Sequence, residues 1–181
     1  AVLMMILNRF RRFARAKSGV AAVEFALLAP MMMFLLFGSI DLIDALSTTK
    51  RVEVTTVSLA DVVSRDTEID DDEVDGLWDA ANMLMFPDTA QTMAMRVTSV
   101  RIESATSARV VWSEGRNAFA PRGAGTSVTL PAAMMTPGTS LIMTETRYRY
   151  DPPVGFLFIG GMNMEHTAYR RSRLVDPIPR V

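Results

Sequence analysis

Apolar residues are concentrated in one long run near the start of the 181-residue chain. The 21 residues from Val20 to Ile40 contain a single ionisable group, Glu24. A helix needs about 20 mainly apolar residues to cross the hydrocarbon core of a bilayer. The pattern therefore predicts a transmembrane helix over 20–40, with one carboxylate about a turn from its start.

Beyond Ile40 the apolar positions recur at steps of three or four residues, which is typical of an amphipathic helix lying on an apolar surface. We predict one continuous helix from Val20 to about Ser64, with 41–64 as its amphipathic half. Most charged residues of this half should take the other faces, namely Asp41, Asp44, Lys50, Glu53 and Asp61. The expected buried stripe consists of Leu42, Leu46, Thr49, Val52, Thr56, Leu59 or Ala60, and Val63.

Two features should weaken this long helix locally. Pro30, and to a lesser degree Gly38, should bend or loosen the apolar half, because proline removes a backbone donor and clashes with the preceding turn. Between residues 52 and 63, many β-branched side chains lower the intrinsic helical preference. Tertiary packing should therefore hold the second half in place.

The segment 66–79 is strongly acidic, and its composition suggests two interpretations. A calcium loop fits poorly, because the twelfth position is Asn82 rather than the bidentate glutamate that such a loop requires. A helix that begins near Asp70 is favoured, since acids in a first turn interact well with the helix dipole; a weak cation site is the alternative. The buried side of this helix should comprise Val74, Leu77, Trp78, Ala81, Leu84 and Met85.

From Met95 onward the period of the apolar positions changes to two, which predicts β-strands. Strands are expected over Met95–Ile102, Ala108–Ser113 and Leu141–Tyr150, with a further strand or strand pair within 154–174. In the third, Thr144, Thr146, Tyr148 and Tyr150 alternate with Glu145, Arg147 and Arg149, which indicates an antiparallel sheet with one wet face. The predicted fold class is α+β: a long N-terminal transmembrane and amphipathic helix packed on a small antiparallel sheet in a soluble domain, 65–181.

Positive charge is concentrated before the apolar run. Five cations lie there: Arg9, Arg11, Arg12, Arg15 and Lys17. The rest of the chain has 14 Lys and Arg residues and 20 acids, which gives it a net charge of about −6. The positive-inside rule then places the N-terminus in the cytoplasm and the domain after Ile40 on the other side of the membrane. No basic patch indicates a nucleic-acid partner.

The composition gives little support for catalysis or cofactor binding. The chain has no cysteine and one histidine, His166, so disulfides, thiolate metal sites and histidine clusters are excluded. Arg170, Arg171 and Arg173 suit a solvated face or an interaction patch. A secretory signal peptide fits poorly, because the apolar run is too long and no Ala-x-Ala-like site closes it before Asp41. We expect no enzyme, no cofactor and no metal.

The residues around Gly19 carry a resemblance to a known family. The basic leader, Gly19, four further residues, Glu24 and Phe25 resemble the cleavage site of type IV prepilins. Residues 19–30, which end at Pro30, are similar to the opening of TadE-like minor pilins (pseudopilins) of tight-adherence, or Flp-type, pilus systems. The late Tyr-x-Tyr and the Arg-rich end are similar in layout. The resemblance implies a pilin-like fold and cleavage after Gly19 by a membrane prepilin peptidase, which removes the leader 1–19 and leaves Val20 as the first residue.

The resemblance also implies a function, and one alternative function remains open. A minor pilin of this group resides in the inner (cytoplasmic) membrane and takes part in assembly of a pilus for surface attachment. Its partners are the prepilin peptidase, other pilins that pack on its N-terminal helix, and the inner-membrane assembly platform. Glu24 would neutralise the new ammonium group of Val20 on a neighbouring subunit and so set the register. In the alternative, the chain is an unprocessed single-pass, membrane-tethered binding module of the cell envelope.

Overall fold

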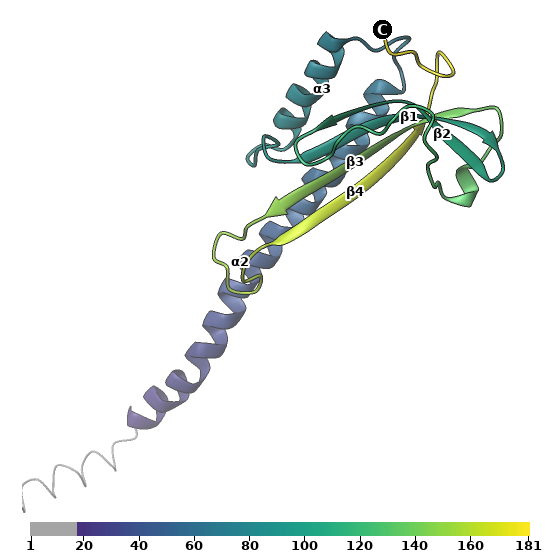
Figure 1. Ribbon diagram of the computed structural model, residues 1–181. Coiled ribbons are helices and arrows are strands. Elements are labelled where there is room, and N and C mark those ends of the chain that lie inside the picture. The colour runs from purple at the N-terminus through teal and green to yellow at the C-terminus, as the bar shows by residue number, and fades with distance from the viewer. Residues whose placement is uncertain (1–17) are drawn as a thin grey trace, which may run out of the picture.

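The structure, a computed structural model, describes residues 18–181, so residues 1–17 of the predicted leader lie outside it. Within residues 18–181, two helices and four strands, joined by loops and one short 3-10 turn, make an α+β fold, as predicted. The elements, labelled as in Figure 1, are α2 (Ser18–Val63), α3 (Asp71–Leu84), β1 (Ala94–Ser104), β2 (Ser107–Arg116), η1 (Ala132–Met134), β3 (Ser140–Tyr150) and β4 (Met162–Arg171).

Helix α2 is the axis of the molecule. Its 46 residues extend about 69 Å at 1.5 Å per residue, and the helix continues through Pro30 without a break. The first half projects away from the rest of the fold, whereas the second half lies against β3, β4 and α3 (Figure 1). The single continuous helix is confirmed; the bend at Pro30 stays a prediction.

The four strands form one antiparallel sheet in the order β2-β1-β3-β4. One face of the sheet packs on α2 and α3 and forms the main core with them. Val52, Thr56 and Leu59 are almost fully buried there and hold the β-branched second half of α2 in place. The predicted strands are confirmed, and the uncertain region 154–174 contains one strand, β4. Other buried members of this core are Val63, Leu77, Trp78, Ala81, Met85, Met95, Val97, Trp112 and Ile142.

The acidic segment begins a helix, as favoured from the sequence. Asp70 caps α3 by accepting a hydrogen bond from the backbone N–H of Glu73, whose carboxylate accepts one from the backbone N–H of Asp70. The predicted buried side is correct except at Leu84, which is exposed. The reason is that α3 ends there, and the next residue, Met85, occupies the core position instead.

The predicted burial of α2 is wrong at its membrane-proximal end. Leu42 and Leu46 are 47% and 59% exposed, whereas Asp41, Ala45 and Thr48 are buried. The domain meets this part of α2 through polar contacts, described below, so the apolar side chains point away from it. The apolar surface of the helix consequently extends beyond Ile40.

The prediction of one wet sheet face is also only partly correct. Glu145, Arg147 and Arg149 do lie on the solvent side, but Leu141 and Met143 on the same side of β3 are buried. The connection between β2 and β3 folds over that end of the sheet and buries a second apolar cluster. Its other members are Val100, Ile102, Ala108, Val110, Val128 and Leu130.

Candidate functional site

The N-terminal half of α2 stands clear of the fold. Residues 19–36 are exposed except for the half-buried Ala29, and an 18-residue window here has a mean hydropathy of 2.2 with none of it buried. This is the one helix among residues 18–181 that is long and apolar enough to cross a membrane. The finding fits a single-pass membrane protein.

The motif residues identified from the sequence all lie on this free half. Gly19 has open space where a Cβ would project, and Val20, Glu24, Phe25 and Pro30 are exposed. Val20 and Glu24 are four residues apart, so they share one helix face. Within residues 18–181 no hydrogen bond or ion pair reaches the Glu24 carboxylate. Within residues 18–181, the structure brings Gly19, Val20, Glu24 and Phe25 against no other element.

Where the free half ends, a buried carboxylate joins α2 to the loop between β3 and β4. Asp41 is 0% exposed and accepts hydrogen bonds from the backbone N–H groups of Val154, Phe156 and Leu157 at 3.2, 2.6 and 3.0 Å. Burial raises the pKa of the Asp41 carboxyl, but these backbone donors lower it by more, so its pKa lies below the ordinary value. The ionised carboxylate therefore holds the loop against the helix.

One turn further along α2, a tyrosine from the end of β3 is fixed to the helix. The Tyr150 hydroxyl donates to Asp44 Oδ2 at 2.8 Å and lies 3.4 Å from the Asp41 carbonyl oxygen. Burial, with the neighbouring Asp44 carboxylate, raises the pKa of Tyr150, so the hydroxyl keeps its proton and acts as the donor. Ala45 and Met164 pack beside this ring.

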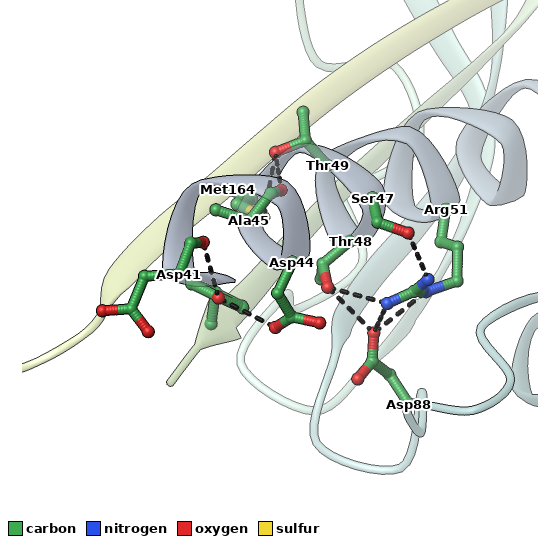
Figure 2. A network of polar contacts seen from close by, with 10 residues as sticks. Asp41, Asp44, Ala45, Ser47, Thr48, Thr49, Arg51, Asp88 and Met164 are labelled. Carbon is green, nitrogen blue, oxygen red and sulfur yellow. Dashed lines mark hydrogen bonds and ion pairs between the residues drawn. The ribbon is translucent and has the colours of Figure 1, made fainter. Parts of the chain in front are cut away.

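A third polar contact joins α2 to the segment after α3. Both Nε and Nη2 of Arg51 donate to Asp88 Oδ2, at 3.0 and 2.7 Å, and the Thr48 hydroxyl donates to the same oxygen at 3.1 Å (Figure 2). Ser47 accepts from Arg51 Nη1 at 2.8 Å. We call the three contacts centred on Asp41, Asp44 and Arg51 the polar junction.

Sequence reasoning missed the polar junction, because it assigned Asp41 and Asp44 to the wet faces of α2. Local periodicity treats a carboxylate as exposed, and the groups that satisfy these two are more than 100 residues away. One signal was present in the sequence: both acids follow directly on the apolar run. Burial of Ala45, directly after Asp44, also marks this side as the packed one.

The other charged candidates are used inside the fold. Arg173 donates to Asp61 at 2.7 Å, Arg171 donates to the Thr136 hydroxyl at 2.8 Å, and Arg170 lies 3.9 Å from Asp61. Arg171 and Arg173 are exposed, as the solvated-face interpretation expects, and they also form these intramolecular bonds. Within residues 18–181 no group of three or more His, Asp or Glu side chains is arranged to hold a metal ion.

The comparisons with known proteins bear on the free half of α2 and the polar junction. Residues 19–54 match the family model of TadE-like proteins. No curated protein and no solved structure gives a match. The matched segment begins at Gly19 and includes Glu24, Pro30, Asp41 and Arg51. The resemblance indicated by the sequence motif is therefore confirmed over residues 19–54, which are similar to TadE-like proteins, consistent with a TadE-like protein of Tad pilus systems.

Proposed function

We propose that this chain is a minor pilin, or pseudopilin, that a prepilin peptidase processes and that takes part in assembly of a tight-adherence (Flp-type) pilus for surface attachment. Its role is structural rather than enzymatic. It resides in the inner membrane, with the N-terminus in the cytoplasm and the α+β domain on the other side. The observation that carries the proposal is that the TadE-like motif lies on the exposed, apolar part of α2 that is long enough to cross a membrane.

Processing gives this helix half its chemistry. Cleavage after Gly19 creates an ammonium group on Val20 next to the membrane, where an isolated charge is costly. Glu24 lies one turn along the same face and supplies a carboxylate, so that the Glu24 of one subunit neutralises the Val20 ammonium of the next. A buried ion pair of this kind fixes the register of packed helices rather than adding net stability.

The exposed apolar surface suits packing against other pilin helices. It continues past Ile40 through Leu42, Ile43 and Leu46, because the domain contacts the opposite side of α2 through the polar junction. Helices of neighbouring pilins and of the assembly platform therefore have an apolar face on α2 that its own domain leaves free. Burial of each such side chain contributes about 1.5–3 kcal/mol once water is excluded.

Processing is tested by the mass and N-terminal residue of membrane-extracted protein from the native host, with and without the prepilin peptidase. A start at Val20 that depends on the peptidase is expected. Gly19→Leu should leave the precursor uncut, while the fold tolerates the new side chain because a Cβ at Gly19 meets nothing within 4 Å. Gly76→Leu is the matched control, since Gly76 is a helical glycine with equally open surroundings. An intact leader in both strains would contradict the proposal and favour the unprocessed tethered module.

Register is tested separately with Glu24→Gln and Glu24→Leu. Both variants should be processed and accumulate in the membrane at the normal level, because Glu24 is bonded to no residue in 18–181. Neither should appear in sheared pili at more than a small fraction of the wild-type amount. Met32→Leu, a volume-conserving change on the same exposed half, should assemble normally. Normal incorporation of both Glu24 variants would refute the assigned role of the carboxylate.

A further inference from the structure

The loop between β3 and β4, residues 151–161, lies against the membrane half of α2 (Figure 1). The ring of Phe156 meets that of Phe34 edge to face, with centroids 5.3 Å apart, and lies 6.4 Å from the ring of Phe37. Leu157 packs over Gly38, where an added Cβ would come within 3.4 Å of it. That separation is ordinary van der Waals contact, so Leu157 lies directly against the helix at Gly38. The loop is therefore fixed beside the last turns of the apolar run.

The position of these contacts along α2 defines the depth of the loop. Val20 to Ile40 covers about 30 Å at 1.5 Å per residue, which equals the thickness of the hydrocarbon core. Phe34 precedes Asp41 by seven residues, or about 10 Å along the axis. A loop that contacts Phe34 and Gly38 consequently lies within the outer part of the span, below the level of Asp41.

The composition of the loop suits that environment. Residues 152–164 contain no ionisable side chain. Val154, Phe156 and Leu157 are each at least 40% exposed, and Ile159, at 86%, is the most exposed large apolar side chain among residues 18–181. A contiguous apolar surface of this kind is unfavourable in water. Beside it, an open hollow is lined almost entirely by apolar groups: Phe34, Leu35, Gly38, Ser39, Leu42 and Leu157.

The loop backbone is also prepared for a medium without water. An unsatisfied backbone donor costs several kcal/mol in hydrocarbon. Asp41 accepts three of the loop N–H groups, and the N–H of Gly161 donates to the carbonyl oxygen of Phe158 at 3.0 Å. These N–H groups are therefore bonded inside the protein, while the Ile159 side chain is left exposed.

We propose that the 151–161 loop is a second membrane contact, whose apolar tip around Ile159 inserts into the acyl-chain region of the leaflet where α2 leaves the bilayer. The inference rests on the proposed function in one respect, that α2 spans a membrane. Lipid is the occupant because the loop surface is continuous with the apolar surface of the spanning half of α2. Interfacial segments of proteins insert their apolar face about 5–10 Å, which matches the depth set by Phe34 and Asp41.

The absence of cysteine makes a direct test simple. Ile159→Cys, Met83→Cys and Leu28→Cys would each be introduced into the full chain, spin-labelled, and reconstituted in vesicles of phosphatidylethanolamine and phosphatidylglycerol. Met83, an exposed apolar residue (77%) on α3, is the matched control, and Leu28 is the reference for the spanning helix. Accessibility to oxygen, which partitions into lipid, is compared with accessibility to a water-soluble nickel chelate.

The expected result is an oxygen-to-nickel accessibility ratio at position 159 that approaches the ratio at 28 and exceeds that at 83 severalfold. A ratio at 159 equal to that at 83, with lipid exposure retained at 28, would overturn the loop insertion alone. Low accessibility of 159 to both reagents, with an immobilised spectrum, would mean that a protein surface covers the loop, and would also overturn it. Loss of lipid exposure at 28 would instead refute the membrane span itself.

Discussion

Replacement of Tyr150 with phenylalanine tests whether the polar junction fixes the domain on α2. The substitution removes only the hydroxyl that donates to Asp44 Oδ2 at 2.8 Å, and the ring stays in its buried site. A hydrogen bond to an ionised group contributes about 1.5–3 kcal/mol. Asp44 is half-buried, so water partly replaces the lost donor. We therefore expect Tyr150→Phe to lower the free energy of unfolding by about 1–2 kcal/mol.

Tyr148 provides a matched control on the same face of β3. It is half-buried, and its hydroxyl forms no hydrogen bond to any residue in 18–181, so Tyr148→Phe should cost less than about 0.5 kcal/mol. The assay is urea unfolding of the full chain in detergent micelles, followed by the fluorescence of Trp78 and Trp112, which are both in the core. The denaturant slope should not change, because neither variant alters the surface exposed on unfolding.

A double-mutant cycle assigns the effect to the pair. Asp44→Asn and Tyr150→Phe should be coupled, since each removes the partner of the other. The reasoning is refuted if Tyr150→Phe is no more destabilising than Tyr148→Phe, or if the cycle shows additive effects. In either case the domain would be held on α2 by apolar packing alone.

Three further predictions concern the core and pH dependence. Trp112→Phe should destabilise the fold by about 2 kcal/mol in the same unfolding assay, because the buried indole N–H donates to the Ile178 carbonyl at 2.8 Å and this oxygen would lose its partner. At Glu145, burial raises the pKa, but the two bonded arginines, Arg96 and Arg122, lower it by more. The stability that the ionised Glu145 contributes is therefore present above pH 4.5 and is lost as the pH falls through the lower pKa of the folded state. The stability gap between wild type and Glu145→Gln should accordingly shrink between pH 7 and pH 3. Burial and the nearby Glu73 raise the pKa of Asp66, which costs stability above its unfolded pKa of 3.8; Asp66→Asn should stabilise the protein at pH 7 and not at pH 3.

The features predicted from the sequence are those encoded locally. The continuous helix α2 followed from an unbroken apolar run and a helical period, and the start of α3 followed from acids placed at its first turn. The position of β3, and the side of it that faces the core, followed from the alternation of Thr144, Glu145 and Thr146. In each case the signal lies within one element, where period and capping chemistry are sufficient.

The features that were missed depend on contacts between distant parts of the chain. Asp41 has the sequence signature of an exposed acid, and its burial requires the backbone of a loop more than 100 residues away. Leu141 and Met143 are buried on the outer sheet face only because the β2–β3 connection folds over them. No local pattern specifies which loop covers which face, so neither feature could be derived from periodicity.

The division of α2 gives the polar junction a role beyond stability. Within residues 18–181, the 151–161 loop contacts the spanning half of α2 at Phe34, Phe37 and Gly38. The domain is fixed next to that half by the bonds of Asp41, Asp44 and Arg51. Close packing of Val52, Leu59 and Val63 in the core resists sliding of the sheet along the helix. Carboxylates bonded to fixed donors favour one register in addition. Under the proposed function, subunits that pack through α2 then carry their domains at one height and one orientation relative to the membrane. The register that we propose Glu24 sets between helices would thereby be transmitted to the domains, because core packing and the polar junction together hold helix and sheet in one position.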